Sequence, residues 1–191
     1  MKNKLILTDC DGVLCDWMYG FSKWMKQHGY EVKQENEYDI AKTFGIEKAE
    51  SKRLVRHFNE SAAMGWLPSL RDAVKYVKKL HEEHGYVFHC ITSLSLDEHA
   101  YKLRKKNLEA LFGKTVFEKL TCLDTGEDKD EALEEYRDSG CYWIEDKVEN
   151  AELGEAMGLE SILITHDYNA DYNNDNIKKV QTWKELYEHI V

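Results

Sequence analysis

Acidic residues fall in two short groups, each placed directly after an apolar run. Asp9 and Asp11 follow the run at 5–8 in the sequence Asp-Cys-Asp-Gly, and an acidic pair at 145–146 follows the run at 141–144. Carboxylates that converge repel one another unless a cation or a proton intervenes. Oxygen-only ligands suit a hard cation, and Mg²⁺ typically takes one or two carboxylates together with water and substrate phosphate. The acids therefore predict a Mg²⁺ site.

Hydroxyl and ammonium groups follow two further apolar runs. Thr92 and Ser93 end one run, and Lys129 follows another. Hydroxyls can hydrogen-bond phosphate oxygens and a lysine can neutralise them, which is the main requirement of phosphoryl transfer. A carboxylate can attack phosphorus to form an aspartyl-phosphate, and a second carboxylate can protonate the leaving alkoxide and then activate water. We therefore expect phosphoryl transfer, with Asp9 as nucleophile and Asp11 as acid and base.

The elements that must position these residues alternate between short apolar runs and helical patterns, as is typical of a parallel α/β sheet. Capping-box spacings at Ser69–Asp72 and Thr182–Glu185 predict two helix starts. Parallel strands end on one edge of a sheet, where open α/β sheets bind ligands. We expect an α/β fold, a Rossmann-like parallel sheet with helices on both faces. The expected strands are 5–8, 86–91, 120–123, 141–144 and 161–165.

Residues 15–67 interrupt this alternation with helical patterns and form an insertion after the first strand. We expect residues 1–14 and 68–191 to form the α/β core and residues 15–67 a small helical cap. Because the insertion leaves from the carboxyl end of a strand, it should cover the site. The cap is rich in aromatic residues that could stack a nucleobase. Trp66, beside the turn where cap rejoins core, is the first candidate, and packing of that turn is the alternative.

Composition excludes several classes of protein. The chain has 191 residues, of which 42% are hydrophobic, and a formal net charge of −10. The acidic balance argues against a nucleic-acid polymer as partner, since that needs a basic surface. No apolar window reaches the length of a membrane span, and five cysteines without zinc-site spacing indicate reduced thiols. We expect a cytoplasmic protein with no membrane partner; the sequence leaves its oligomeric state open.

Taken in order, these motifs resemble the four motifs of the haloacid dehalogenase-like hydrolases. The first, a hydrophobic strand followed by Asp-x-Asp-Gly and Thr or Val, is matched by residues 5–13. A strand ending in Ser or Thr is matched by residues 87–92, the motif lysine best by Lys129, and the acidic pair after a strand by residues 142–146. The resemblance covers nearly the whole chain and is weakest in the insertion.

The resemblance implies a role for each acidic residue. Asp9 would be the nucleophile and a Mg²⁺ ligand. Asp11 would be the acid and base, with its backbone carbonyl on the metal. Asp146 would be the third protein ligand, and Glu145 would support the site indirectly or act as an alternative ligand.

The resemblance also implies how the phosphate is held. Thr92 would bind a phosphate oxygen through its hydroxyl, and Lys129 would neutralise the phosphate charge. Ser93 would add a hydrogen bond, with the capping of a turn as the alternative. Other lysines compete for the role of Lys129, namely Lys114, Lys119 and Lys147.

Within the family, the sequence is most similar to the 5′(3′)-deoxyribonucleotidases. The likeness rests on the short helical cap, the run at 91–93, Tyr168–Asn169 and Trp183. The sequence departs from those enzymes at Leu94, where a proline commonly stands. The likeness implies a small phosphorylated substrate, with nucleoside monophosphates as candidates.

Two alternatives stay open at this point. One is a phosphatase of sugar phosphates or other small metabolites, since nothing in the insertion defines recognition of a base. The other belongs to a different class, a catalytically idle Mg²⁺-binding interaction module on the same fold. Such a module could lack Asp9 or Asp11, and this chain has both.

Overall fold

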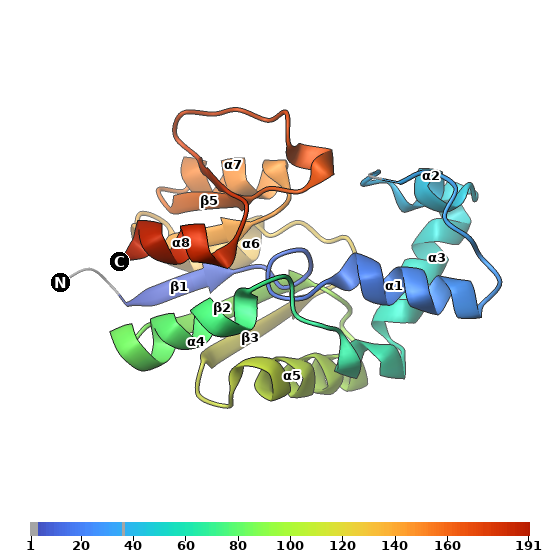
Figure 1. The fold of residues 1–191 in the computed structure, drawn as a ribbon, viewed down its shortest axis with the longest axis horizontal. Helices are drawn as coiled ribbons and strands as arrows, with labels where there is room; N and C mark the ends of the chain where they lie inside the picture. Colours follow the sequence, from blue (N-terminus) through green and yellow to red (C-terminus); the bar gives the residue numbers. More distant parts are fainter. Residues whose placement is uncertain (1–3, 36) are drawn as a thin grey trace.

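A computed structural model describes residues 4–35 and 37–191. In this part of the chain the sheet has six parallel strands in the order β3-β2-β1-β4-β5-β6, so β1 lies in the middle. The strands are β1 (Leu5–Thr8), β2 (Val87–Ser93), β3 (Phe117–Leu123), β4 (Tyr142–Glu145), β5 (Glu160–Ile164) and β6 (Lys178–Val180). The predicted α/β class with a parallel sheet is confirmed (Figure 1).

Helices cover both faces of the sheet, as predicted. Successive side chains of a strand point to opposite faces, and on β1 Ile6 packs into one apolar cluster while Leu7 packs into another. The first cluster includes residues of α4 (Ala73–His84), α5 (Glu98–Phe112) and α8 (Trp183–Ile190). The second includes residues of α6 (Asp130–Leu133) and the 3-10 helix η2 (Glu134–Tyr136), and α7 (Val148–Ala156) packs on β4 and β5. A further 3-10 helix, η3 (Asp167–Asn169), follows β5.

Two parts of the sheet differ from the expected strands. β3 begins at Phe117, three residues before the predicted start, because its first residues pair with β2 across a register shift. β6 was not predicted, since Lys178–Val180 is only three residues long and two of its residues are lysines. It forms the edge of the sheet next to β5.

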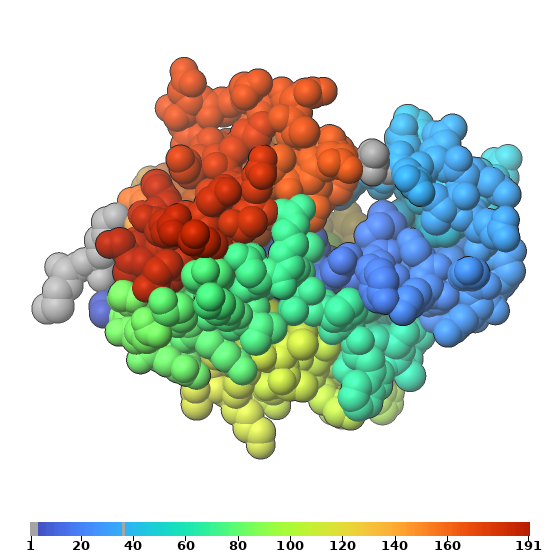
Figure 2. Space-filling model, viewed as in Figure 1, coloured from blue at the N-terminus to red at the C-terminus, as the bar shows by residue number. Residues whose placement is uncertain are grey.

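The insertion after β1 is helical, as expected. It consists of α1 (Trp17–Gln27), α2 (Ile40–Phe44), α3 (Lys48–Asn59) and the 3-10 helix η1 (Ala62–Trp66). Figure 1 shows it beyond the carboxyl end of β1, and Figure 2 shows the molecule hollowed between the insertion and the orange part of the core. Thus the insertion faces the sheet edge where the predicted site residues lie.

The two connections between insertion and core run side by side. Cys15 forms an isolated antiparallel bridge with Ser69, the Asp16 amide donates to the carbonyl of Pro68 at 2.9 Å, and the Leu70 amide donates to Leu14 at 2.8 Å. This pairing ties the entry and exit of the insertion together. The division into core and cap at residues 15 and 67 remains a prediction.

Composition predicted reduced cysteines and no membrane-spanning segment. All five cysteines are free thiols, and four of them are buried. Over the described ranges, no helix combines the length and the apolar character needed to span a membrane.

Candidate active site

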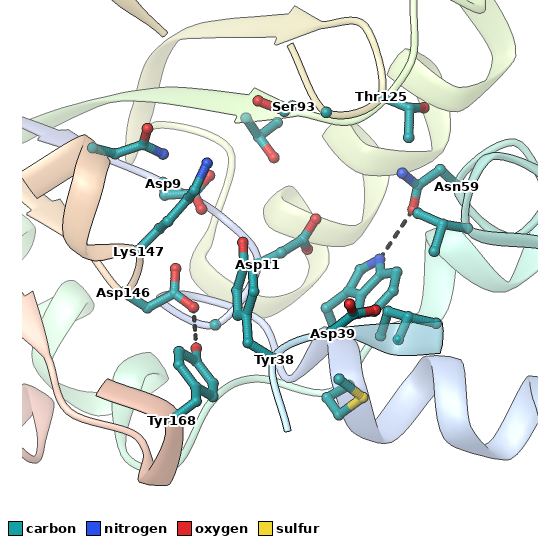
Figure 3. A pocket seen from close by; sticks show the side chains of 18 of the residues that line it. Asp9, Asp11, Tyr38, Asp39, Asn59, Ser93, Thr125, Asp146, Lys147 and Tyr168 are labelled. Atoms are coloured by element: carbon teal, nitrogen blue, oxygen red, sulfur yellow. Dashed lines mark hydrogen bonds between the residues drawn. The ribbon is translucent and has the colours of Figure 1, made fainter. Parts of the chain in front are cut away.

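A cavity of about 860 Å³ lies between the insertion and the carboxyl ends of the strands. Figure 3 shows Asp9, Asp11 and Asp146 at one side of it, with Asn59 of the insertion across the space. The cavity wall includes six of the seven predicted site residues, namely Asp9, Asp11, Thr92, Ser93, Lys129 and Asp146. The parallel sheet thus brings together residues separated by up to 137 positions in the sequence, as the strand-end argument predicted.

Asp9 lies at the centre of this group, one residue after β1. Its backbone amide donates to the carbonyl of Ile144 at 2.9 Å, which extends the pairing of β1 with β4. Its Oδ1 lies 2.8 Å from Nζ of Lys129. Burial raises the pKa of the Asp9 carboxyl well above its ordinary value, and although Lys129 opposes this shift, the neighbouring acids add to it. A carboxylate in this position is stable only with a compensating cation.

Asp9, Glu145 and Asp146 form a compact acidic cluster, with one oxygen of each within 4.8 Å of the others. Burial, followed by the charge of Glu145, raises the pKa of Asp146 to about 8. The hydroxyl of Tyr168 donates to Oδ2 of Asp146 (Figure 3). These three buried acids offer only oxygen donors, and their mutual repulsion favours a divalent cation, so the donor set fits Mg²⁺.

Glu145 already has partners for both of its oxygens. Oε1 accepts from Lys129 at 2.6 Å and from Asn150 at 2.8 Å. Oε2 accepts from the backbone amides of Asp146 at 2.9 Å and Lys147 at 3.0 Å. The side chain is fully buried. This arrangement favours the indirect role for Glu145, in which it orients Lys129 and the start of α7.

Lys129 stands between two acids, at the residue before α6. Its Nζ lies 2.8 Å from Asp9 and 2.6 Å from Glu145, and its side chain is 3% exposed. Burial disfavours its charged form, but the two carboxylates raise its pKa above the ordinary value. Among the competing lysines, Lys119 instead pairs with Glu135. The position of Lys129 is the one expected for a cation beside the nucleophile.

The two hydroxyl residues at the end of β2 differ. Thr92 is 1% exposed, and it contributes to the cavity wall. Ser93 also lies on the wall, but its hydroxyl donates to the carbonyl of Glu127 at 2.7 Å. That bond ties the loop after β3 to β2, so Ser93 fits the turn-capping alternative better than the phosphate role.

Arg104 of α5 is a site residue that was not predicted. Its Nη1 lies 2.8 Å from Oδ1 of Asp11 and its Nη2 donates to Oδ2 at 2.8 Å. The guanidinium is fully buried and also donates to the thiol of Cys10 at 2.9 Å. Burial raises the pKa of Asp11 to about 6, with Arg104 opposing the shift. The sequence did contain a signal for the burial of Arg104. It stands four residues after Ala100 and four before Leu108, on the apolar side of α5, whereas the other cations of that helix face solvent.

Gly12 makes room for Asp146. Its φ is +78°, and a Cβ built there would lie 2.3 Å from Oδ2 of Asp146. The carbonyl of Gly12 lies 2.7 Å from Nε2 of His166. A glycine is therefore required for two reasons: the left-handed backbone and the close approach of a carboxylate.

The first candidate for base stacking was wrong. Trp66 is 72% exposed and lies outside the cavity wall, with Nζ of Lys106 4.5 Å from its ring centroid. η1 packs on α5 with Gly65 against Leu103, and Met64 and Gly65 are its buried residues instead of Trp66. Trp17 is the tryptophan on the cavity wall.

Trp17 is held by two aromatic contacts and one hydrogen bond. Its ring stacks on Phe21 with centroids 4.5 Å apart, and Phe58 meets it edge-on at 5.5 Å. Its Nε1 donates to Asn59 Oδ1 at 3.0 Å (Figure 3). The Asn59 amide in turn donates to the carbonyl of Leu94 in the core at 2.9 Å. This chain of contacts links α1 and α3 to the core beside the cavity.

No family model matches this sequence. A relative, an uncharacterized 32.4 kDa protein of the Gp30–rIII intergenic region of Enterobacteria phage T4, is 27% identical over 124 residues. The match covers 61% of this chain and 44% of that protein, so this chain spans less than half of the relative's length.

Several solved structures share the whole architecture. A haloacid dehalogenase-like hydrolase from Streptococcus pneumoniae superimposes with a TM-score of 0.67 at 14% identity, covering 98% of both chains. A predicted phosphatase from Clostridium acetobutylicum gives 0.66 at 15% identity and 97% of both chains. CbbY from Rhodobacter sphaeroides, solved with phosphate, gives 0.63 at 18% identity and 96% of both. The likeness to the deoxyribonucleotidases gains no support from these comparisons. The chain has the fold of the haloacid dehalogenase-like hydrolases.

Proposed function

We propose that this protein is a Mg²⁺-dependent phosphatase that hydrolyses a small phosphate monoester through an aspartyl-phosphate on Asp9. The observation that carries the proposal is the position of Asp9. Its carboxylate lies on the cavity wall, 2.8 Å from the Lys129 ammonium and within 4.8 Å of oxygens of Glu145 and Asp146. A carboxylate that could act as nucleophile, a cation and an acidic cluster that could hold a metal ion thus lie together, which supports the proposal. The shared fold with phosphatases supports the same function.

The reaction has two steps. In the first, a carboxylate oxygen of Asp9 attacks phosphorus, the bond to the leaving oxygen breaks, and Asp11 gives that oxygen its proton. In the second, Asp11 takes a proton from water, the water oxygen attacks phosphorus, and the bond to Asp9 breaks to release phosphate. Lys129 stays charged throughout and balances the phosphate oxygens. A pKa of about 6 lets Asp11 gain and lose a proton near neutral pH.

The residues that would hold Mg²⁺ are the carboxylates of Asp9 and Asp146 and the backbone carbonyl of Asp11. The bound ion would neutralise acids and phosphate oxygens together. Two hydrogen bonds hold Asp146 in place. Asn169 Nδ2 donates to the Asp146 backbone carbonyl at 2.7 Å, and the Tyr168 hydroxyl donates to the Asp146 carboxylate.

The substrate should be a small molecule, because the insertion covers the cavity and leaves about 860 Å³. That volume lies within the usual range of small-molecule sites. A nucleoside monophosphate is one candidate, supported by the indole of Trp17 on the wall. A sugar phosphate is the alternative, supported by polar wall residues such as Asp16, Asp39 and Asn59.

The test is release of phosphate from an aryl phosphate by wild type and by Asp9→Asn. We expect turnover with Mg²⁺, none after chelation, and recovery when Mg²⁺ is returned. Asp9→Asn should lose the activity while keeping its melting temperature in the metal-free state. Turnover by Asp9→Asn at the wild-type rate would reject the mechanism, and a folded wild type without turnover would favour the idle module. A panel of nucleotides and sugar phosphates then ranks the substrates.

A further inference from the structure

A stripe of three cations runs along the cavity face of α3. Lys48, Lys52 and Arg56 stand four residues apart, so they share one side of the helix, and all three belong to the cavity wall. Eight residues of helix span about 12 Å. This stripe lies in a protein with a net charge of −10, and it lines the same cavity as Asp9 and Asp146.

The three cations differ in their partners. Nη2 of Arg56 lies 2.9 Å from both oxygens of Asp124, in the segment after β3, and its Nη1 lies 3.6 Å from Glu60. Among the described residues, no carboxylate lies within ion-pair distance of Lys48 or Lys52. Arg56 therefore ties α3 to the core, while Lys48 and Lys52 are exposed on the cavity wall and lack a carboxylate partner in the described part of the chain.

The stability of α3 does not explain this pattern. Like charges at four-residue spacing destabilise a helix slightly. Lys48 is also the first residue of α3, where the helix dipole disfavours a cation. On the same helix, Arg53 points elsewhere and pairs with Glu50 at 3.7 Å, as surface helix residues commonly do. The two lysines are thus placed at a cost to the helix, which an anion in the cavity would offset.

We propose that Lys48 and Lys52 bind a second anionic group of the substrate. The inference rests on the proposed phosphatase function, because it names the far end of the molecule whose phosphate reaches Asp9. The substrate is then a phosphate monoester that carries a carboxylate or a second phosphate at its other end. The buried Ser51 and the half-buried Val55 lie on the same wall, so beside the two lysines the substrate would also contact uncharged side chains.

The experiment compares substrates that differ only at the far end. The three probes are an ω-hydroxyalkyl phosphate, an ω-carboxyalkyl phosphate and an alkane bisphosphate of equal chain length, each measured as kcat/KM with Mg²⁺. We expect wild type to prefer either the ω-carboxyalkyl phosphate or the bisphosphate over the hydroxyalkyl phosphate. Which of the two it prefers shows whether the lysines bind a carboxylate or a second phosphate. Lys48→Gln and Lys52→Gln should each reduce this preference about tenfold, as for a hydrogen bond to a charged group. The matched control is Arg53→Gln, a change of charge on another face of the same helix, which should keep the wild-type preference.

The outcomes separate this inference from the function on which it rests. An aryl phosphate is measured alongside, together with the melting temperature of each variant. Turnover of the aryl phosphate without any preference for a second anion would overturn the inference and leave the phosphatase intact. An equal loss for all probes in the lysine variants, or the same change in Arg53→Gln, would also overturn it. A folded wild type that turns over none of the probes would reject the proposed function and this inference with it.

Discussion

Arg104 pairs with Asp11: its Nη2 donates a hydrogen bond to Oδ2 at 2.8 Å, and its Nη1 lies at ion-pair distance, 2.8 Å, from Oδ1. The guanidinium is fully buried, whereas the Asp11 side chain keeps 22% of its surface exposed. A charge-assisted hydrogen bond together with the second close contact restricts where this carboxylate can lie. The proposed acid and base is therefore oriented by α5, an element remote from it in sequence.

Replacing Arg104 should affect both stability and the step that needs a proton. Removal of one partner of a buried ion pair costs about 3–5 kcal/mol, so Arg104→Gln should lower the free energy of unfolding by that order. Turnover of an alkyl phosphate should fall further than turnover of an aryl phosphate, because the poorer leaving group depends more on Asp11. Arg104→Lys keeps the charge but loses the planar guanidinium, so its turnover should fall between those of wild type and Arg104→Gln. Equal losses for both substrates would show that Arg104 supports folding alone.

Gly12→Ala tests the close approach of Gly12 to Asp146. The new Cβ would lie 2.3 Å from the Asp146 carboxylate, so we expect loss of the Mg²⁺-induced rise in melting temperature and at least a tenfold loss of activity. Gly29→Ala is the matched control, because Gly29 has a φ of +86° and open space around it. It should cost about 1 kcal/mol of backbone strain and leave metal response unchanged. A metal response in Gly12→Ala equal to wild type would contradict the assignment of Asp146.

The metal-free protein should become less stable as pH rises. Burial raises the pKa of Asp11 to about 6 and of Asp146 to about 8, above the unfolded value of about 3.9. The folded state therefore binds more protons than the unfolded state, so this contribution is complete below pH about 4 and is lost as pH rises through the folded pKa values.

Urea unfolding of chelated protein between pH 5 and 9 measures this loss. Asp146→Asn should flatten the decline, and saturating Mg²⁺ should remove most of it by replacing the protons. A wild-type profile identical to that of Asp146→Asn would contradict the buried acidic cluster as its source.

Alanine variants of Trp17 and Trp66 distinguish stacking on the substrate from packing within the protein. If a nucleoside monophosphate is the substrate, Trp17→Ala should lower nucleotide kcat/KM about tenfold relative to an aryl phosphate, the order expected for one stacked base. Trp66→Ala should leave that ratio unchanged, because Trp66 lies outside the cavity wall. Parallel kinetics and melting curves for both variants make the comparison. A lower melting temperature without a change in the ratio for Trp17→Ala would remove the support for a nucleotide.

The grouping of the candidate site residues was predictable because it depends on strand ends. The positions of Asp9, Thr92 and Asp146 follow from apolar runs that were predicted to be parallel strands. The position of Lys129 follows from its place after the run at 120–123. Each of these inferences uses only local pattern and the rule that parallel strands end on one edge.

The residues that were missed depend on packing between distant segments. The Ser69–Asp72 spacing predicted a cap for α4, yet the Asp72 carboxylate accepts from the amides of Trp183 and Lys184 at 3.0 Å and caps α8 instead. Arg71, at a φ of +40°, bends the chain away from the predicted helix start. Arg104 likewise finds its partner in a loop 93 residues away. Local spacing cannot show which of several segments a side chain will meet.

The central claim is that Asp9 carries the phosphoryl group, and mapping of the covalent intermediate tests it most directly. Asp11→Asn should accumulate the intermediate, since it lacks the base that activates water. The protein is treated with a radiolabelled aryl phosphate and Mg²⁺, quenched in acid and digested, and the labelled peptide is identified. We predict hydroxylamine-sensitive label on the peptide containing Asp9, and none when Asp9→Asn is added to the variant. Label on another residue, or label that persists with Asp9→Asn, would contradict the account.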